Sequence, residues 1–154
     1  MDQDAFRKTY REVNERFCAF EKAVLTNQCG CSQAEKFCIA EREGVHCMSD
    51  PGQEACLEIL DMLREQARFA LRGTEETRTL LPHGKAIRVQ VGGMRGIQAL
   101  LENGEASEQI NDIYTTLLAA IEEFSSLDAL PFDKIMPHIA AYQGRTRSRR
   151  RSRD

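Results

Sequence analysis

Six cysteines are the residues of this sequence whose chemistry and spacing point to a function. Five of them lie between Cys29 and Cys56, and Cys18 stands eleven residues before Cys29. Thiolates bind soft and borderline metal ions, and four of them complete a tetrahedral zinc site or hold an iron–sulfur cluster. The segment therefore predicts a metal or redox site. Four of the six recur at a nine-residue interval: Cys29, Cys38, Cys47 and Cys56.

Sequence distance suggests which thiols share one metal. Cys29 and Cys31 are separated by a single glycine, so they can reach the same ion or cluster. Cys18 and Cys56 fall in predicted helices and can be brought alongside when these helices pack. His46 is an alternative ligand, although it adjoins a cysteine and both could reach one ion only with an unusual backbone. The predicted ligands are Cys29, Cys31, Cys38 and Cys47, with Cys18 and Cys56 in reserve.

The nature of the metal stays open at this point. The spacing C-x10-C-x-C-x6-C-x8-C-x8-C lacks the short paired intervals of zinc fingers and bacterial ferredoxins. Six thiols exceed what one structural zinc uses, which favours an iron–sulfur cluster, while the histidine and glutamates of the segment keep zinc possible. The alternative is that Cys18 and Cys56 are small core residues and that the loop thiols form disulfides or have no role.

Apolar periodicity predicts the elements that position these thiols. We expect a mainly α fold, a helical bundle of four to five helices with a small β element and a Cys-rich loop. The chain forms one domain over residues 1–144, with the Cys-rich metal-site segment at 18–56. A strand is predicted over 85–91, where apolar and polar residues alternate. The predicted helices cover about 3–27, 51–72, 94–102, 107–125 and 132–142, and the turns at Gly30 and Gly44 leave room for an optional short helix over 32–42.

The glycine-rich stretch VGGMRG follows the predicted strand and precedes a predicted helix. Backbone N–H groups in such a setting can hold a phosphate, and Gly93 to Gly96 has the G-x-x-G form found in KH domains. The stretch lacks the full dinucleotide-binding and P-loop patterns. A plain tight turn is the favoured interpretation.

Charge is distributed unevenly along the chain. Residues 145–153 contain six arginines, whereas residues 1–144 contain 15 Lys and Arg against 23 Asp and Glu, a net charge of −8. We expect residues 145–154 to form a disordered Arg-rich tail. Such a tail can bind nucleic acid or an acidic protein surface, or can merely aid solubility.

The sequence predicts a cytoplasmic protein, since no apolar run is long enough to span a membrane and no leader peptide is recognisable. In a reducing compartment, clustered cysteines are more often ligands or redox thiols than disulfides. No arrangement typical of nucleophilic catalysis is present, so no catalytic residue is assigned. We expect a small metal-binding protein with an iron–sulfur cluster or zinc, acting in electron transfer or as an accessory to a larger metalloenzyme.

The alternative is a nucleic-acid-binding or redox-sensing regulatory protein with a structural zinc and the Arg-rich tail. The expected partner is another protein, a metalloenzyme or a redox partner. Nucleic acid could bind through residues 145–153, and no membrane association is expected.

Overall fold

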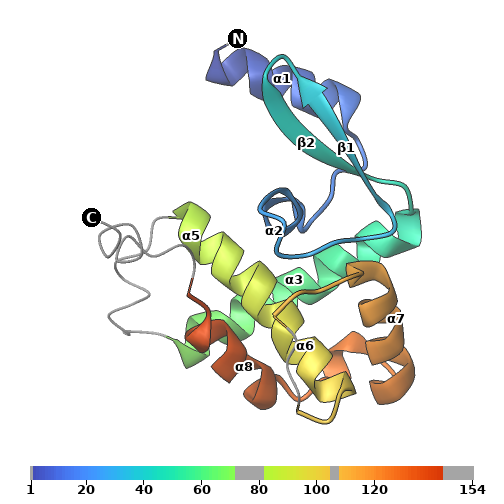
Figure 1. Cartoon of the computed structure of the whole chain (residues 1–154), viewed down its shortest axis with the longest axis vertical. Coiled ribbons are helices and arrows are strands. Elements are labelled where there is room, and N and C mark those ends of the chain that lie inside the picture. Colours follow the sequence, from blue (N-terminus) through green and yellow to red (C-terminus); the bar gives the residue numbers. More distant parts are fainter. Residues whose placement is uncertain (1, 72–81, 105–107, 144–154) are drawn as a thin grey trace.

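The computed structural model describes residues 2–71, 82–104 and 108–143, and their fold is mainly helical with one two-stranded hairpin, as predicted (Figure 1). In this part of the chain no helix is both long enough and apolar enough to cross a membrane. The Arg-rich tail predicted for 145–154 lies outside the described residues. The helices are α1 (Gln3–Val13), α2 (Glu21–Leu25), α3 (Asp50–Ala70), α5 (Pro82–Ile87), α6 (Gly93–Leu101), α7 (Ile113–Phe124) and α8 (Phe132–Ala141), with a π-helical turn at Arg88–Gly92 and a 3-10 turn at Leu127–Ala129.

The long helix predicted over 3–27 is interrupted between α1 and α2. Asn14, which is 2 % exposed, ends α1 and donates a hydrogen bond of 2.9 Å from Nδ2 to the carbonyl of Val45. Its Oδ1 lies 3.0 Å from Nδ1 of His46. An asparagine side chain offers bonds that compete with helix continuation, and here the partners are distant in sequence. The helical prediction for residues 14–20 was therefore wrong.

The β element lies at 34–47, where the sequence left room for a short helix over 32–42. Strand β1 (Ala34–Ile39) pairs antiparallel with β2 (Arg42–Cys47), from Ala34 opposite Cys47 to Ile39 opposite Arg42. Gly44 leaves room for the ring of Phe37 across the hairpin, because a Cβ there would meet a ring carbon at 2.5 Å. Tyr10 of α1 covers the same ring, with 5.9 Å between centroids. Long-range packing thus overrides local helix propensity in this segment.

The strand predicted over 85–91 is instead part of a helical run from α5 through the π-helical turn to α6. Residues 90–94 are all buried, and a helix enclosed on every side loses the amphipathic period that identifies it in sequence. Gly92 and Gly96 of VGGMRG allow close contact with α8, and Gly93 allows close contact with Leu63 of α3. A Cβ on Gly92 would lie 2.6 Å from the Cα of Ile139, and one on Gly96 would lie 2.8 Å from the Cγ2 of Ile135. Helix packing therefore explains these glycines.

Helix α3 crosses the centre of the molecule and connects the hairpin to the helical body (Figure 1). The predicted helix over 51–72 is confirmed, although its N-cap is Ser49, whose hydroxyl accepts a 3.0 Å hydrogen bond from the N–H of Gly52. The predicted helices over 94–102 and 132–142 are confirmed as α6 and α8, and α7 begins later than predicted. The core is made by fully buried side chains of these helices: Ile59, Leu60, Leu63, Met94, Ile97, Ile113, Leu117, Ile135 and Ile139.

Candidate metal centre

Four cysteines from four separate segments line one small cavity between the hairpin and α3. Cys18 precedes α2, Cys31 follows it, Cys47 ends β2 and Cys56 lies in the second turn of α3. The volume of this cavity that the centre of a water molecule can reach is about 10 Å³, which is room for roughly one water molecule. The remaining lining residues are Ala19, Phe20, Ala34, Gln53 and Ile113.

Strand pairing directs the side chains of Cys18 and Cys47 to the same face of the sheet. Residues 16–18 pair with the free edge of β2: the N–H of Cys18 donates to the Val45 carbonyl at 3.0 Å, and that of Cys47 donates to the Arg16 carbonyl at 2.7 Å. Phe17 stands opposite His46 in this antiparallel bridge. Because side chains alternate along a strand, Phe17 and His46 take one face and the two cysteines take the other. The cysteine face looks onto α3 and Cys56.

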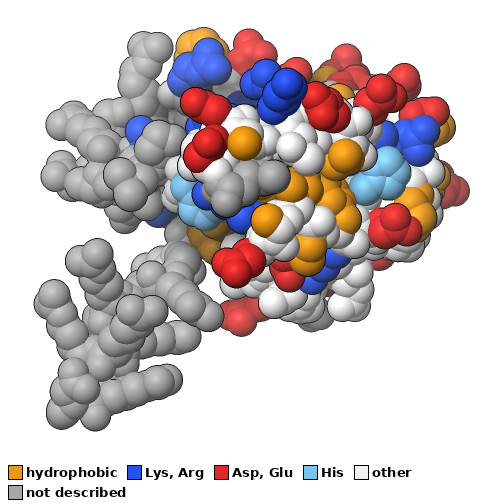
Figure 2. Space-filling view, turned by 90° about the horizontal axis from the view of Figure 1, so that it is seen from above, with side chains coloured by type: hydrophobic (Ala, Val, Ile, Leu, Met, Phe, Trp, Pro, Cys, Tyr) orange, Lys and Arg blue, Asp and Glu red, His pale blue; other side chains and the backbone are white. Residues whose placement is uncertain are grey.

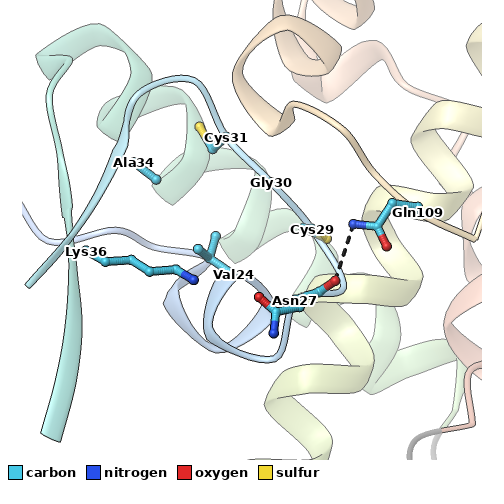
Figure 3. Close-up of a pocket in the computed structure, with 8 residues that line it drawn as sticks. All are labelled: Val24, Asn27, Cys29, Gly30, Cys31, Ala34, Lys36 and Gln109. Carbon is cyan, nitrogen blue, oxygen red and sulfur yellow. Dashed lines mark hydrogen bonds between the residues drawn. The ribbon is translucent and has the colours of Figure 1, made fainter.

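Cys31 is positioned by a segment about eighty residues further along the chain. The N–H of Gly30 donates to the Ile110 carbonyl at 2.7 Å, and the N–H of Ile113 donates to the Gly30 carbonyl at 2.9 Å. A Cβ on Gly30 would stand 2.7 Å from the backbone oxygen of Asn111, so this close approach requires glycine. Figure 3 shows Cys29 and Cys31 on either side of Gly30, with side chains pointing in different directions.

Asp112 joins the cysteine loop to α7. Its carboxylate caps α7 by accepting the N–H of Tyr114 at 3.1 Å, and it accepts the N–H of Ser32 at 2.9 Å. Burial alone would raise the pKa of Asp112, but the hydrogen bonds from Ser32 and Tyr114 lower it below its ordinary value. One carboxylate oxygen of Asp112 thus holds both the start of α7 and Ser32, the residue after Cys31.

Replacing Asp112 by alanine is expected to destabilise the protein by about 2 kcal/mol, because the cap and the bond to Ser32 are lost together. Asp112→Asn, which keeps an oxygen acceptor, is the matched control and should lose less. Urea unfolding of the reduced apoprotein measures both. Equal stability of wild type and Asp112→Ala would show that the carboxylate does not hold the loop.

Backbone N–H groups point at two of the four sulfur atoms. The sulfur of Cys18 accepts a hydrogen bond from the backbone of Phe20, and that of Cys31 accepts bonds from the backbone of Gln33 and Tyr114. Each of these bonds favours the thiolate. The thiol of Cys47 instead donates to the Ser49 carbonyl at 3.3 Å. Hydrogen bonds to sulfur are among the features that tune metal–thiolate centres.

Burial raises the pKa of Cys18, Cys31 and Cys56, so these three thiols stay neutral in the absence of a cation. Burial, with smaller contributions from the neighbouring Cys31 and Cys47, raises the pKa of Cys18 to about 12. The pKa of Cys56 is raised by burial and then by its proximity to Cys18, Cys31 and Cys47. A bound cation reverses this balance, because it releases the protons and compensates the converging negative charges.

The structure separates the remaining predicted ligands from this group. Cys29 is buried on the other side of the loop, near Arg95, and burial raises its pKa to about 12. It lines a second, more open cavity of about 300 Å³ together with Asn27, Lys36 and Gln109 (Figure 3). Cys38 is exposed on β1, four residues beyond Ala34, which is roughly 13 Å along a strand. His46 lies on the strand face opposite Cys18 and Cys47.

The four converging cysteines therefore comprise two of the predicted set, Cys31 and Cys47, and the two reserve residues, Cys18 and Cys56. None of the six cysteines forms a disulfide. As the side chains stand in the described residues, no group of three or more His, Cys, Asp or Glu is placed to hold a metal ion. The thiols border a shared space instead of meeting at one point.

Two further features singled out in the sequence are the glycine-rich stretch and the arginines of residues 145–153. The glycine stretch lies inside helices packed on α8, as described above, and this removes the loop needed for a phosphate or KH-type site. Nucleic-acid binding through residues 145–153 rests on the sequence alone, since these residues lie outside the described part of the chain.

Comparisons of this chain with protein-family models, with curated proteins and with solved structures find no match.

Proposed function

We propose that the protein holds an iron–sulfur cluster through Cys18, Cys31, Cys47 and Cys56, and that it acts in electron transfer or as an accessory to a larger metalloenzyme. The observation that carries this proposal is the convergence of four thiols from four segments on one small cavity. Four cysteines are the usual ligand set of both [2Fe–2S] and [4Fe–4S] clusters. A structural zinc is the runner-up.

The hydrogen bonds at the sulfur atoms support a metal over a purely structural role. A neutral thiol behaves as a small apolar group in a core and needs no hydrogen-bond donor. At Cys18 and Cys31, however, three backbone groups in total donate to sulfur, an arrangement that compensates thiolate charge. Burial first, and then the proximity of Cys18, Cys31 and Cys47, raises the pKa of Cys56, so its thiolate is stable there only beside a cation.

The placement of the four thiols favours a cluster over a single ion. Tetrahedral zinc draws its four sulfur atoms to about 2.3 Å from one centre. A cluster is bound at separate iron atoms, so its cysteines stand around it. The four thiols border a shared space and are not placed around one point, so a single zinc would require all four side chains to move inward.

The test is anaerobic purification followed by reconstitution with ferrous iron and sulfide, with a visible absorption spectrum and chemical analysis of iron, acid-labile sulfide and zinc. The proposal predicts a coloured protein that retains iron and sulfide after gel filtration. A colourless protein with about one zinc per chain would replace it with a structural zinc site. Reactive thiols without bound metal would overturn both.

A further inference from the structure

Strand β1 has an open outer edge. On its inner side β1 pairs with β2, and residues 16–18 lie along the far edge of β2. Among the described residues no strand pairs with the outer side of β1. Lys36 and Cys38, near the middle of β1, are exposed. An open edge presents backbone N–H and C=O groups that another extended chain can bind.

The pairing of β2 shows which backbone groups of β1 point outward. The carbonyl of Val45 accepts the N–H of Cys18, so Val45 directs its backbone groups away from β1. In an antiparallel pair, two residues directly opposite each other either exchange hydrogen bonds or both point their groups away. Lys36 stands opposite Val45, and Cys38 lies two residues further along β1. The N–H and C=O groups of Lys36 and Cys38 therefore point to the open edge and offer two donors and two acceptors.

A cavity borders this edge. It is the cavity of about 300 Å³ described above, which is lined by Ala34 and Lys36 of β1 together with residues of α2 and of the loop that follows α2. This volume is at the lower end of the range of ligand pockets. Figure 3 shows the Lys36 side chain extending from β1 toward Val24 and Asn27. A strand bound at the edge can thus place a side chain in this cavity.

The charge at the cavity comes from Lys36, which is the one charged side chain among the described residues that line it. In the described part of the chain its ammonium forms no ion pair. Figure 2 shows the end of the molecule where α1 and the hairpin lie, with Lys and Arg side chains interspersed among Asp and Glu. A broad field of one sign is therefore absent from this view, and the charge that can select a ligand is local.

We propose that the open edge of β1 binds an extended segment of a partner protein, which adds as an antiparallel strand and carries Asp or Glu opposite Lys36. Backbone hydrogen bonds to Lys36 and Cys38 supply affinity, and the side chain beside the cavity supplies specificity. Residues directly opposite each other share one face of a sheet, so the acidic side chain meets the Lys36 ammonium. Glu43 stands opposite Cys38 on that face and disfavours a second acid there. The inference goes beyond the proposed function and requires no metal at the cysteines.

The first test uses the full chain under reducing conditions and a labelled probe peptide, Ser-Val-Thr-Val-Glu-Val-Ser, blocked at both ends. When its glutamate stands opposite Lys36, its threonine stands opposite Cys38. Methylation of the backbone nitrogen of either residue removes a donor to β1 and should weaken binding about fivefold or more. Methylation of the valine between them, whose N–H points away from β1, is the matched control and should leave affinity unchanged. Fluorescence anisotropy measures the dissociation constants.

The second test changes the protein. Lys36→Glu should weaken binding of the probe about fivefold, because attraction becomes repulsion, and a probe with lysine in place of glutamate should recover the loss. Lys8→Glu, at an exposed lysine of α1, is the control for net charge and should bind as the wild type. Cys38→Pro removes one outward N–H, which an edge strand tolerates, and should weaken binding, whereas Cys38→Ser should not.

Amide hydrogen exchange then locates the bound peptide: the probe should slow exchange at Lys36 and Cys38. Absence of binding, equal affinity of the three methylated peptides, or no recovery by charge reversal would overturn the proposal. Protection of the same amides that rises with protein concentration, without peptide, would also overturn it, because a second copy of the chain would then occupy the edge. Iron and sulfide analysis tests the cluster separately, so the two proposals fail independently.

Discussion

Cys56→Ala is expected to reduce bound iron and sulfide to background after reconstitution, and Cys18→Ala, Cys31→Ala and Cys47→Ala should do the same. A cluster held by four thiolates has no spare ligand in this cavity, since its other lining residues are Ala19, Phe20, Ala34, Gln53 and Ile113. Loss of one ligand costs more than the 10- to 100-fold loss of affinity that is typical when a supporting contact is removed. Visible absorption and iron analysis measure the result.

Cys38→Ala is the matched control for this series, because Cys38 is exposed and lies away from the cavity. It should retain the absorption and the iron of the wild type. Urea unfolding of the apoproteins separates ligation from packing: Cys56→Ala should cost the apoprotein about 1 kcal/mol, since one small buried group is removed. Full iron content in Cys56→Ala, or loss of iron in Cys38→Ala, would contradict the assigned ligand set.

Gly92→Ala is expected to destabilise the protein by about 3 kcal/mol. The added methyl carbon would lie 2.6 Å from the Cα of Ile139 and 2.9 Å from the carbonyl oxygen of His138. Both are backbone atoms of α8, so a change of rotamer cannot relieve the overlap and the two helices must separate. The unfolding midpoint in urea should fall with little change in the slope.

The control for this substitution is Gly104→Ala, at a glycine that has φ near +91° and no neighbouring atom within 4 Å of an added Cβ. Its expected cost is about 1 kcal/mol, which comes from the backbone conformation and not from contact. If Gly92→Ala were as mild as Gly104→Ala, the close approach of the π-helical turn to α8 would not exist in solution.

Local sequence patterns correctly predicted the helices whose start and apolar face are set by residues close together in sequence. Helix α3 carries a Ser-Asp-Pro start and a regular apolar stripe, and its predicted extent differs from the observed one by a residue or two at each end. The mainly helical class follows from such stripes. The predictions failed where tertiary contacts decide the structure: Asn14 ends a helix by bonding to β2, and Gly92 permits a helix to be buried against another.

The sequence predicted a cluster of cysteines, and the set that the structure brings together differs from the predicted one. The regular nine-residue interval drew attention to Cys29 and Cys38, whereas the converging thiols are separated by 13, 16 and 9 residues. Convergence depends on the pairing of residues 16–18 with β2 and on the attachment of Gly30 to Ile110, and neither contact has a local sequence signal. One usable clue was Cys56, which shares the apolar face of α3 with Leu60 and Leu63.

The attachment of Gly30 to Ile110 has a consequence for the order of events during synthesis. All four thiols have been made once residue 56 leaves the ribosome, yet the segment that positions Cys31 follows more than fifty residues later. At roughly 5–20 residues per second, the nascent chain carries unassembled thiols for several seconds. We therefore expect the cavity to close after α7 has emerged, so that loading of the centre follows completion of most of the chain.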